Sequence, residues 1–177
     1  MNMSKFLLSI FYKANLAAFR AAILENDTNR ICRILDIERE HICKILDNAG
    51  NTALLLAIQF AAPLTVHVLL EQGAQADQIN SVTNQTPLGL LASTVYNEHQ
   101  CYETKSAVEM ATMLLDHGAY VDKPSPYVYT DENGKEQSIR ETPLMTAVRT
   151  RNFSIAGLLI NRKANVNYCE KHTDYRP

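Results

Sequence analysis

The chain has 177 residues, of which 46% are hydrophobic, and carries a formal net charge of −2. This length suits one domain or one short repeat array, and the hydrophobic share is sufficient for a packed core. Acidic and basic residues are interspersed, so no basic footprint for nucleic acid is present, and no apolar run reaches the roughly 18 residues that a membrane-spanning helix needs.

The first segment, residues 1–46, is predicted to form an N-terminal cap with one degenerate repeat. Apolar residues 6–12 continue at helical spacing into Phe19 and Ile23, which indicates a helix at the start of the chain. A weakly charged start followed by a short apolar stretch is also the pattern of a secretory signal, and this alternative stays open.

Three later segments share one skeleton of a Thr start, a pair of large aliphatic residues and a closing turn residue. The starts are Thr52, Thr86 and Thr142. The aliphatic pairs are Leu69-Leu70, Leu114-Leu115 and Leu159-Ile160. The closing residues are Gly73, Gly118 and Lys163. A threonine hydroxyl can cap the start of a helix, and glycine readily adopts the left-handed conformation that ends one. The skeleton therefore predicts two helices in each copy.

This skeleton resembles the ankyrin repeat, a unit of about 33 residues with a hairpin turn and two helices. The 21 positions from Thr52 to Gly73 recur between Thr142 and Lys163. The resemblance implies a single all-α domain, 1–177, built as a solenoid of about four helix-pair repeats. The expected boundaries are 1–46 for the cap and repeat 1, 47–80 for repeat 2, 81–122 for repeat 3, 140–169 for repeat 4 and 170–177 for a tail.

Two departures from the spacing indicate insertions. About 11 extra residues fall in repeat 3, within 95–106, and about 12 in the following hairpin, within 123–139. Asn133-Gly134 between two strand-like stretches predicts that the second insertion forms an extended hairpin. Both insertions are expected to project as loops, and inserted loops in repeat proteins often lie on the binding face.

No motif predicts catalysis, and we expect neither an enzyme activity nor a cofactor. His99 with Cys101 and Cys169 with His172 are two pairs of metal-ligand types, but neither has the spacing of a zinc module, so we expect no metal. Widely spaced cysteines without a CxxC pair favour a reducing compartment. We therefore expect a cytoplasmic protein with access to the nucleus.

The ankyrin resemblance also implies where a partner binds, namely at hairpin tips and first helices. The inserted tyrosines are candidate interface anchors, with the alternative that their rings pack their own loop. The last repeat should leave an apolar face bare, which a partner or a second copy would cover. The predicted protein-binding residues are Asn48, Asn51, Gln59, Phe60, Thr83, Gln85, Thr94, Tyr127, Tyr129, Ile139, Glu141, Arg149, Phe153 and Leu158.

The identity of the partner rests on size and repeat number alone. A chain of this size with about four ankyrin units is similar to an activating, non-catalytic subunit of a serine/threonine kinase complex that controls the embryonic cell cycle and DNA replication. That similarity implies a protein kinase and its companion subunit as partners. The small ankyrin inhibitors of cyclin-dependent kinases are the second group of this build, and an adaptor or effector scaffold is the third. Fold alone does not decide between them.

Overall fold

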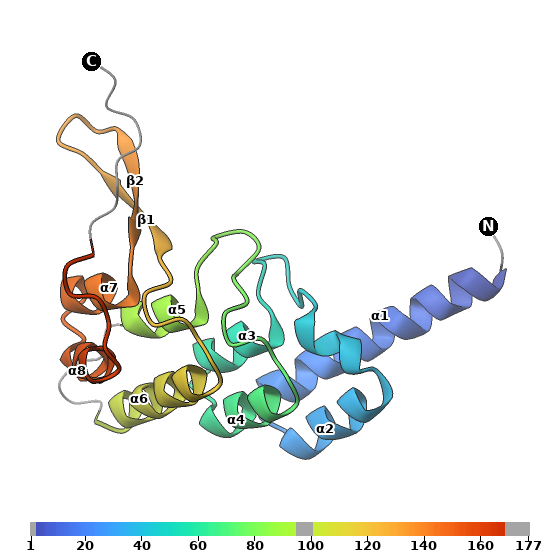
Figure 1. Ribbon diagram of the computed structural model, residues 1–177. Coiled ribbons are helices and arrows are strands. Elements are labelled where there is room, and N and C mark those ends of the chain that lie inside the picture. Colours follow the sequence, from blue (N-terminus) through green and yellow to red (C-terminus); the bar gives the residue numbers. More distant parts are fainter. Residues whose placement is uncertain (1–2, 95–100, 169–177) are drawn as a thin grey trace.

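The structure is a computed structural model that describes residues 3–94 and 101–168. Its helices come in four successive pairs (Figure 1). The first pair is α1 (Met3–Leu24) and α2 (Thr28–Ile37), followed by the short 3-10 helix η1 (Arg39–Cys43). The other pairs are α3 (Ala53–Gln59) with α4 (Pro63–Glu71), α5 (Pro87–Ser93) with α6 (Cys101–Asp116), and α7 (Pro143–Arg149) with α8 (Phe153–Asn161).

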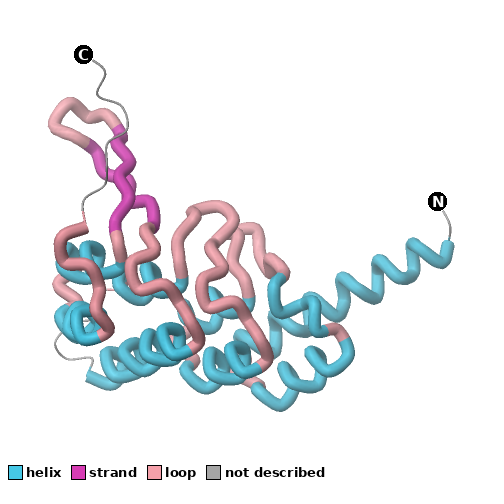
Figure 2. Tube along the Cα trace, viewed as in Figure 1, coloured by secondary structure: helices cyan, strands magenta, loops and turns pink. Residues whose placement is uncertain are grey.

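The pairs lie side by side in one row. The first helices contact one another in the order α1, α3, α5, α7, and the second helices in the order α2, α4, α6, α8. Figure 1 shows α1 extending beyond the row at one end, while α7 and α8 form the other end. The loops between pairs rise on one side of the helices (Figure 2). We call this the loop side.

The three predicted helix starts are confirmed. Each threonine hydroxyl accepts a hydrogen bond from the backbone N–H three residues later, at 3.0–3.4 Å. These caps are Thr52 for α3, Thr86 for α5 and Thr142 for α7. Pro87 and Pro143 occupy the first helical position, where no N–H is needed. The threonine starts therefore cap their helices as the sequence predicts.

The closing residues are also confirmed as turn positions. Gly73 and Gly118 have φ of +94° and +86°, values that an L side chain rarely adopts. Lys163, which replaces glycine in the last pair, is held at +64°. The last pair therefore keeps the same turn at a conformational cost that glycine would avoid.

The core runs through the whole row. α1 contributes Phe19 and Ile23, and the second helices contribute Leu69, Leu114 and Leu159, all of them fully buried. Burying one such side chain is worth about 1.5–3 kcal/mol. Residues 6–12 lie within α1, and within the described residues no helix is long and apolar enough to cross a membrane.

The first insertion differs from its prediction. Residues 101–106 do not form a loop but are the first turns of α6, which has 16 residues where α4 and α8 have nine. The stretch 101–106 contains neither glycine nor proline, so nothing in it breaks a helix. Residues 95–100 and the tail 170–177 lie outside the described residues.

The second insertion forms the extended hairpin that Asn133-Gly134 predicts. Strands β1 (Ser125–Thr130) and β2 (Glu136–Glu141) pair antiparallel, from Ser125 opposite Glu141 to Thr130 opposite Glu136. The hairpin projects from the loop side beside α7 (Figure 1). The described part of the chain is therefore helix-rich, as expected, and the insertion adds one small two-stranded sheet.

Candidate protein-binding surface

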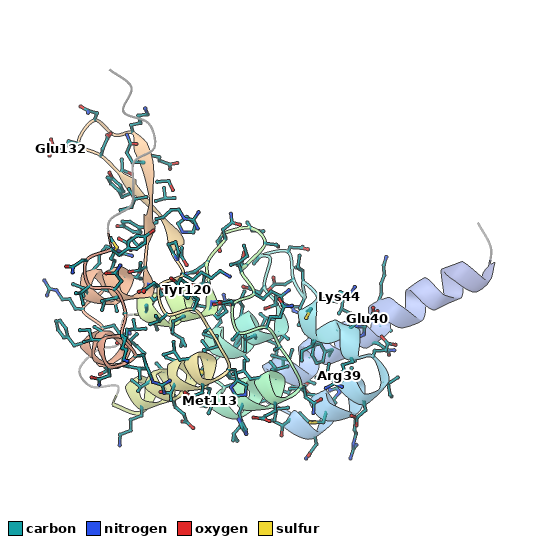
Figure 3. The ribbon with its side chains drawn as sticks, viewed as in Figure 1. Arg39, Glu40, Lys44, Met113, Tyr120 and Glu132 are labelled. Atoms are coloured by element: carbon teal, nitrogen blue, oxygen red, sulfur yellow. The ribbon has the colours of Figure 1, made fainter. Side chains whose placement is uncertain are left out.

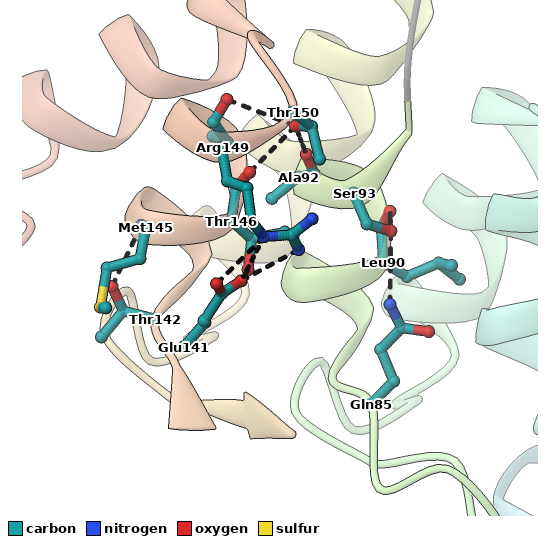
Figure 4. Close-up of polar contacts among 11 residues, drawn as sticks. Gln85, Leu90, Ala92, Ser93, Glu141, Thr142, Met145, Thr146, Arg149 and Thr150 are labelled. Carbon is teal, nitrogen blue, oxygen red and sulfur yellow. Dashed lines mark hydrogen bonds and ion pairs between the residues drawn. The ribbon is translucent and has the colours of Figure 1, made fainter. Parts of the chain in front are cut away.

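A repeated polar contact joins each loop to the first helix that follows it. The residue before the capping threonine bonds to a side chain eight positions later, at the end of the helix. The pairs are Asn51 with Gln59, Gln85 with Ser93, and Glu141 with Arg149. Figure 4 shows the second and third of them. Each pair ties the loop side to the body of its helix pair.

Two predicted contact residues are consequently buried and cannot act as free surface. Asn51 is 3% exposed and bonds to Asp47, Gln59 and Asn80. Glu141 is 5% exposed, and its carboxylate accepts bonds from Arg149. Buried polar groups are stable only when they have such partners, so these two positions serve the structure of the chain.

The remaining predicted residues fall into two groups by exposure. Exposed ones are Asn48, Gln59, Phe60, Thr83, Tyr129, Arg149 and Phe153. Half-buried ones are Gln85, Thr94, Tyr127, Ile139 and Leu158. The predicted residues do not form one continuous surface. Phe60 lies at the turn between α3 and α4, at the end of α3 that is far from the loop side. There it lines a pocket with Leu24 and Leu64.

Four of the predicted residues meet at the base of the hairpin. The Arg149 guanidinium donates from Nε and Nη2 to the Glu141 carboxylate at 3.0–3.1 Å. It also lies over the Tyr127 ring, 3.7 Å from the centroid. The Tyr127 and Tyr129 rings stack with centroids 6.1 Å apart and planes at 16°. A continuous chain of contacts thus runs from a buried carboxylate to an exposed aromatic ring.

The two tyrosines share one face of the sheet because alternate residues of a strand point the same way. Tyr127 pairs with Ile139 and Tyr129 with Gln137 across the hairpin. Val128, on the opposite face, is 58% exposed. The hairpin therefore presents apolar groups on both faces, with the tyrosine face anchored by Arg149.

The hairpin tip is ordered by one carboxylate. Asp131 accepts bonds from the backbone N–H groups of Asn133 and Lys135 and from the side chain of Gln137. The Gln137 bond, followed by the bond from Lys135, lowers the pKa of Asp131. Glu132 lies at this tip, away from the helices (Figure 3). A charged, internally bonded tip keeps the strands in register.

Sequence reasoning missed Tyr120, which is 61% exposed on the loop side. Its backbone N–H donates to Asp77 of the preceding loop, which fixes the residue while its ring stays accessible (Figure 3). The available signal was its position two residues after Gly118, where the other two copies have Gln75 and Asn165. An aromatic ring at a position that is polar in the other two copies could have indicated a candidate contact residue.

The described residues contain no group of three or more His, Cys, Asp or Glu side chains that could hold a metal ion. Of the two His and Cys pairs that the sequence analysis rejects as a zinc module, His99, Cys169 and His172 lie outside the described residues.

A comparison with known families bears on the last helix pair. The ankyrin-repeat family model matches residues 140–171, which include α7 and α8. Ankyrin repeats are protein-interaction modules and are typically non-catalytic. No curated protein matches the chain. The match supports the ankyrin resemblance, and it identifies no individual kinase subunit.

Proposed function

We propose that this chain binds a protein partner through its loop side, with the β1–β2 hairpin as the main contact. The observation that carries the proposal is the linked set of Glu141, Arg149, Tyr127 and Tyr129. Aromatic and arginine side chains dominate binding energy at protein interfaces. Here they are held in place before any partner arrives, so binding does not have to order them.

The hairpin exposes a large side chain on each of its faces. Tyr129 and Val128 are exposed on its two faces, and Tyr120 is exposed on the loop side. The bond from Thr86 N–H to Ser125 Oγ, at 3.0 Å, attaches β1 to α5, and the Glu141–Arg149 pair attaches β2 to α7. The hairpin is therefore fixed to two neighbouring helix pairs.

The partner that we propose is a serine/threonine protein kinase with its companion subunit. The chain would act as a non-catalytic activator of this kinase in the embryonic cell cycle. It would do so in the cytoplasm, with access to the nucleus. Size and the number of helix pairs support this choice. The test distinguishes this proposal from two alternatives. One is inhibition of a cyclin-dependent kinase, and the other is a scaffold role for an unrelated protein.

The test compares two baits in extracts of early embryos, the unaltered chain and a Tyr127→Ala/Tyr129→Ala variant, by quantitative mass spectrometry. Removing two interface anchors should weaken a bound partner by roughly 30-fold or more, equivalent to about 2 kcal/mol. Leu64→Ala is the matched control, since Leu64 is 67% exposed on α4, away from the hairpin. A kinase should be enriched by the unaltered chain and the control but not by the double variant.

Kinase activity then separates the alternatives. Adding the purified chain to the captured kinase should raise its activity, whereas a fall in activity would indicate an inhibitor. A hairpin-dependent partner that is not a kinase would contradict the kinase assignment. If no partner depends on the two tyrosines, the hairpin is not the contact surface and the proposal is wrong.

A further inference from the structure

The side of α1 opposite the core carries apolar residues along the whole helix. Positions seven residues apart lie on one side of a helix, and α1 has such an apolar series: Met3, Ile10, Ala17 and Leu24. The side chains of Ala17 and Leu24 are exposed. Phe19, which is fully buried, comes two positions after Ala17 and therefore lies about 200° away around the helix. The series thus follows the outer side of α1, away from the core.

The N-terminal part of α1, residues 3–12, has an amphipathic pattern. Figure 1 shows it extending beyond the row of helix pairs, and its length is about 15 Å at 1.5 Å per residue. Seven of its ten residues are apolar or aromatic. Lys5, Ser9 and Lys13 are spaced four apart and so form one polar stripe. A basic stripe beside a wide apolar sector with phenylalanine and leucine is typical of helices that lie in a membrane interface.

The charge of this helix favours anionic surroundings. Residues 1–24 contain three basic residues and no acidic residue, a formal charge of +3. Since the whole chain carries −2, residues 25–177 carry −5. Lys13 is exposed and has no hydrogen bond or ion pair with another described residue, whereas Arg20 has an electrostatic interaction with Asp47. A basic helix on an acidic body is attracted to an anionic surface while the body is repelled from it.

A hollow on the outer side of α1 combines basic and apolar groups. Its volume is about 310 Å³. Lys13 and Arg20 line it together with the apolar side chains of Leu16, Leu24 and Leu46. Anionic lipids carry the same two chemistries, because a negatively charged headgroup lies above their acyl chains. A second copy of α1 would instead bring two charges of +3 together, which disfavours pairing of the two helices.

We infer that α1 binds the surface of an anionic lipid bilayer, with residues 3–12 in the headgroup region and their apolar side towards the acyl chains. Lys5 and Lys13 then lie at the level of the lipid charges, where each basic residue strengthens binding. About 15 Å of helix cannot cross a hydrocarbon core of about 30 Å, so the contact is peripheral. Figure 1 places this helix at the opposite end of the row from the hairpin, and the inference does not depend on the proposed function.

Vesicle flotation tests the inference with the full chain. The two probes are vesicles of phosphatidylcholine alone and vesicles in which about one third of the lipid is phosphatidylserine. The chain should bind the anionic vesicles at least about tenfold more tightly than the neutral ones, because its basic residues act at the lipid surface. Raising the salt concentration should weaken this binding, since salt screens the lipid charge.

A tryptophan reporter locates the contact. The chain has no tryptophan, so Phe11→Trp introduces a single fluorophore into the N-terminal part of α1. Its emission should shift to shorter wavelength with anionic vesicles, because the indole ring enters a less polar environment. Phe153→Trp is the matched control, since Phe153 is 73% exposed on α8 at the other end of the row, and its emission should not shift.

Charged substitutions separate the apolar and the electrostatic parts of the contact. Phe11→Asp and Ala17→Asp place a negative charge on the apolar side, and Lys13→Glu reverses a basic charge. Each should weaken binding to anionic vesicles by about tenfold or more. Lys13 and Ala17 are exposed, so their variants should fold, which circular dichroism checks. Lys135→Glu, at an exposed position of the hairpin tip, is the matched control and should leave binding unchanged.

Three results would overturn the inference. The first is equal binding to the two kinds of vesicle, or binding to neither. The second is vesicle binding that none of the three α1 variants weakens, or an emission shift of Phe153→Trp alone, which would place the contact elsewhere on the chain. The third is self-association in sedimentation velocity that Phe11→Asp abolishes while the vesicles stay unbound, which would make a second copy the occupant.

Discussion

Replacing Arg149 by alanine removes the guanidinium that holds the Glu141 carboxylate at the base of the hairpin. Three hydrogen bonds of 3.0–3.1 Å and the contact with the Tyr127 ring are lost. Only the bond from the Thr146 hydroxyl to Glu141 remains among those described. The carboxylate, whose side chain is 7% exposed, would then have to be hydrated or protonated in place.

The size of the effect follows from burial. Removing one partner of a fully buried ion pair costs about 3–5 kcal/mol. The Arg149 side chain is 37% exposed, so water can enter its place, and we reduce this to about 2 kcal/mol. Loss of the ring contact adds about 0.5 kcal/mol at a partly exposed site. For a chain of this length the total corresponds to a fall in melting temperature of roughly 5–10 °C.

Urea unfolding followed by circular dichroism measures this change, and a double-mutant cycle isolates the pair. Glu141→Gln, Arg149→Ala and the combined variant should give a coupling energy of about 1–2 kcal/mol. Arg149→Lys is the control that keeps the charge but loses the two-point geometry, and it should fall between the unaltered chain and Arg149→Ala. A cost below about 0.5 kcal/mol with additive single effects would refute the reasoning, because the ion pair would then be screened by water.

Three further predictions concern the loops. Gly50→Ala should lower the free energy of unfolding by about 2–4 kcal/mol, because φ is +82° and the new Cβ would lie 2.6 Å from Ser81 Oγ. Gly73→Ala, at +94° with open space around the new Cβ, should lower it by only about 1 kcal/mol in the same urea assay. Lys163→Gly should raise the free energy of unfolding by about 0.5 kcal/mol, since relief of the left-handed strain exceeds the added chain entropy, and an unchanged value would contradict the strain. For Asp47, burial raises the pKa, but hydrogen bonds from Asn51 and Ala49 outweigh it and hold the pKa below 3.8. The Asp47 carboxylate therefore stabilises the fold above that pH, and the advantage of the unaltered chain over Asp47→Asn should shrink as pH falls below about 4 in acid titrations of stability.

The sequence predicted the helix starts well because their cause is local. A threonine cap needs only a backbone N–H three residues away, and Thr52, Thr86 and Thr142 each find one. The hairpin was predictable for the same reason, since Asn133-Gly134 defines its turn. The start of α6 was not, because repeat spacing gives the length of an insertion but not the point within it where a helix begins.

The candidate site was predicted less well because burial depends on neighbouring pairs. Asn51 has the position of a surface residue in its own loop, yet Asn80, 29 residues later, donates to its side chain and covers it. Glu141 and Arg149 were each predicted as contact residues, but their mutual pairing requires the loop and the end of α7 to meet in space. Such contacts between elements are not visible in a spacing pattern.

The pairing of Ser125 with Glu141 brings the two ends of the long connection together at the base of the hairpin. The length of the hairpin between these two residues therefore does not change the distance that the connection spans from α6 to α7. Evolution can lengthen, shorten or rewrite the hairpin without disturbing the core. For the same reason the tip around Asn133 and Gly134 is a suitable place to graft a foreign recognition loop onto this chain.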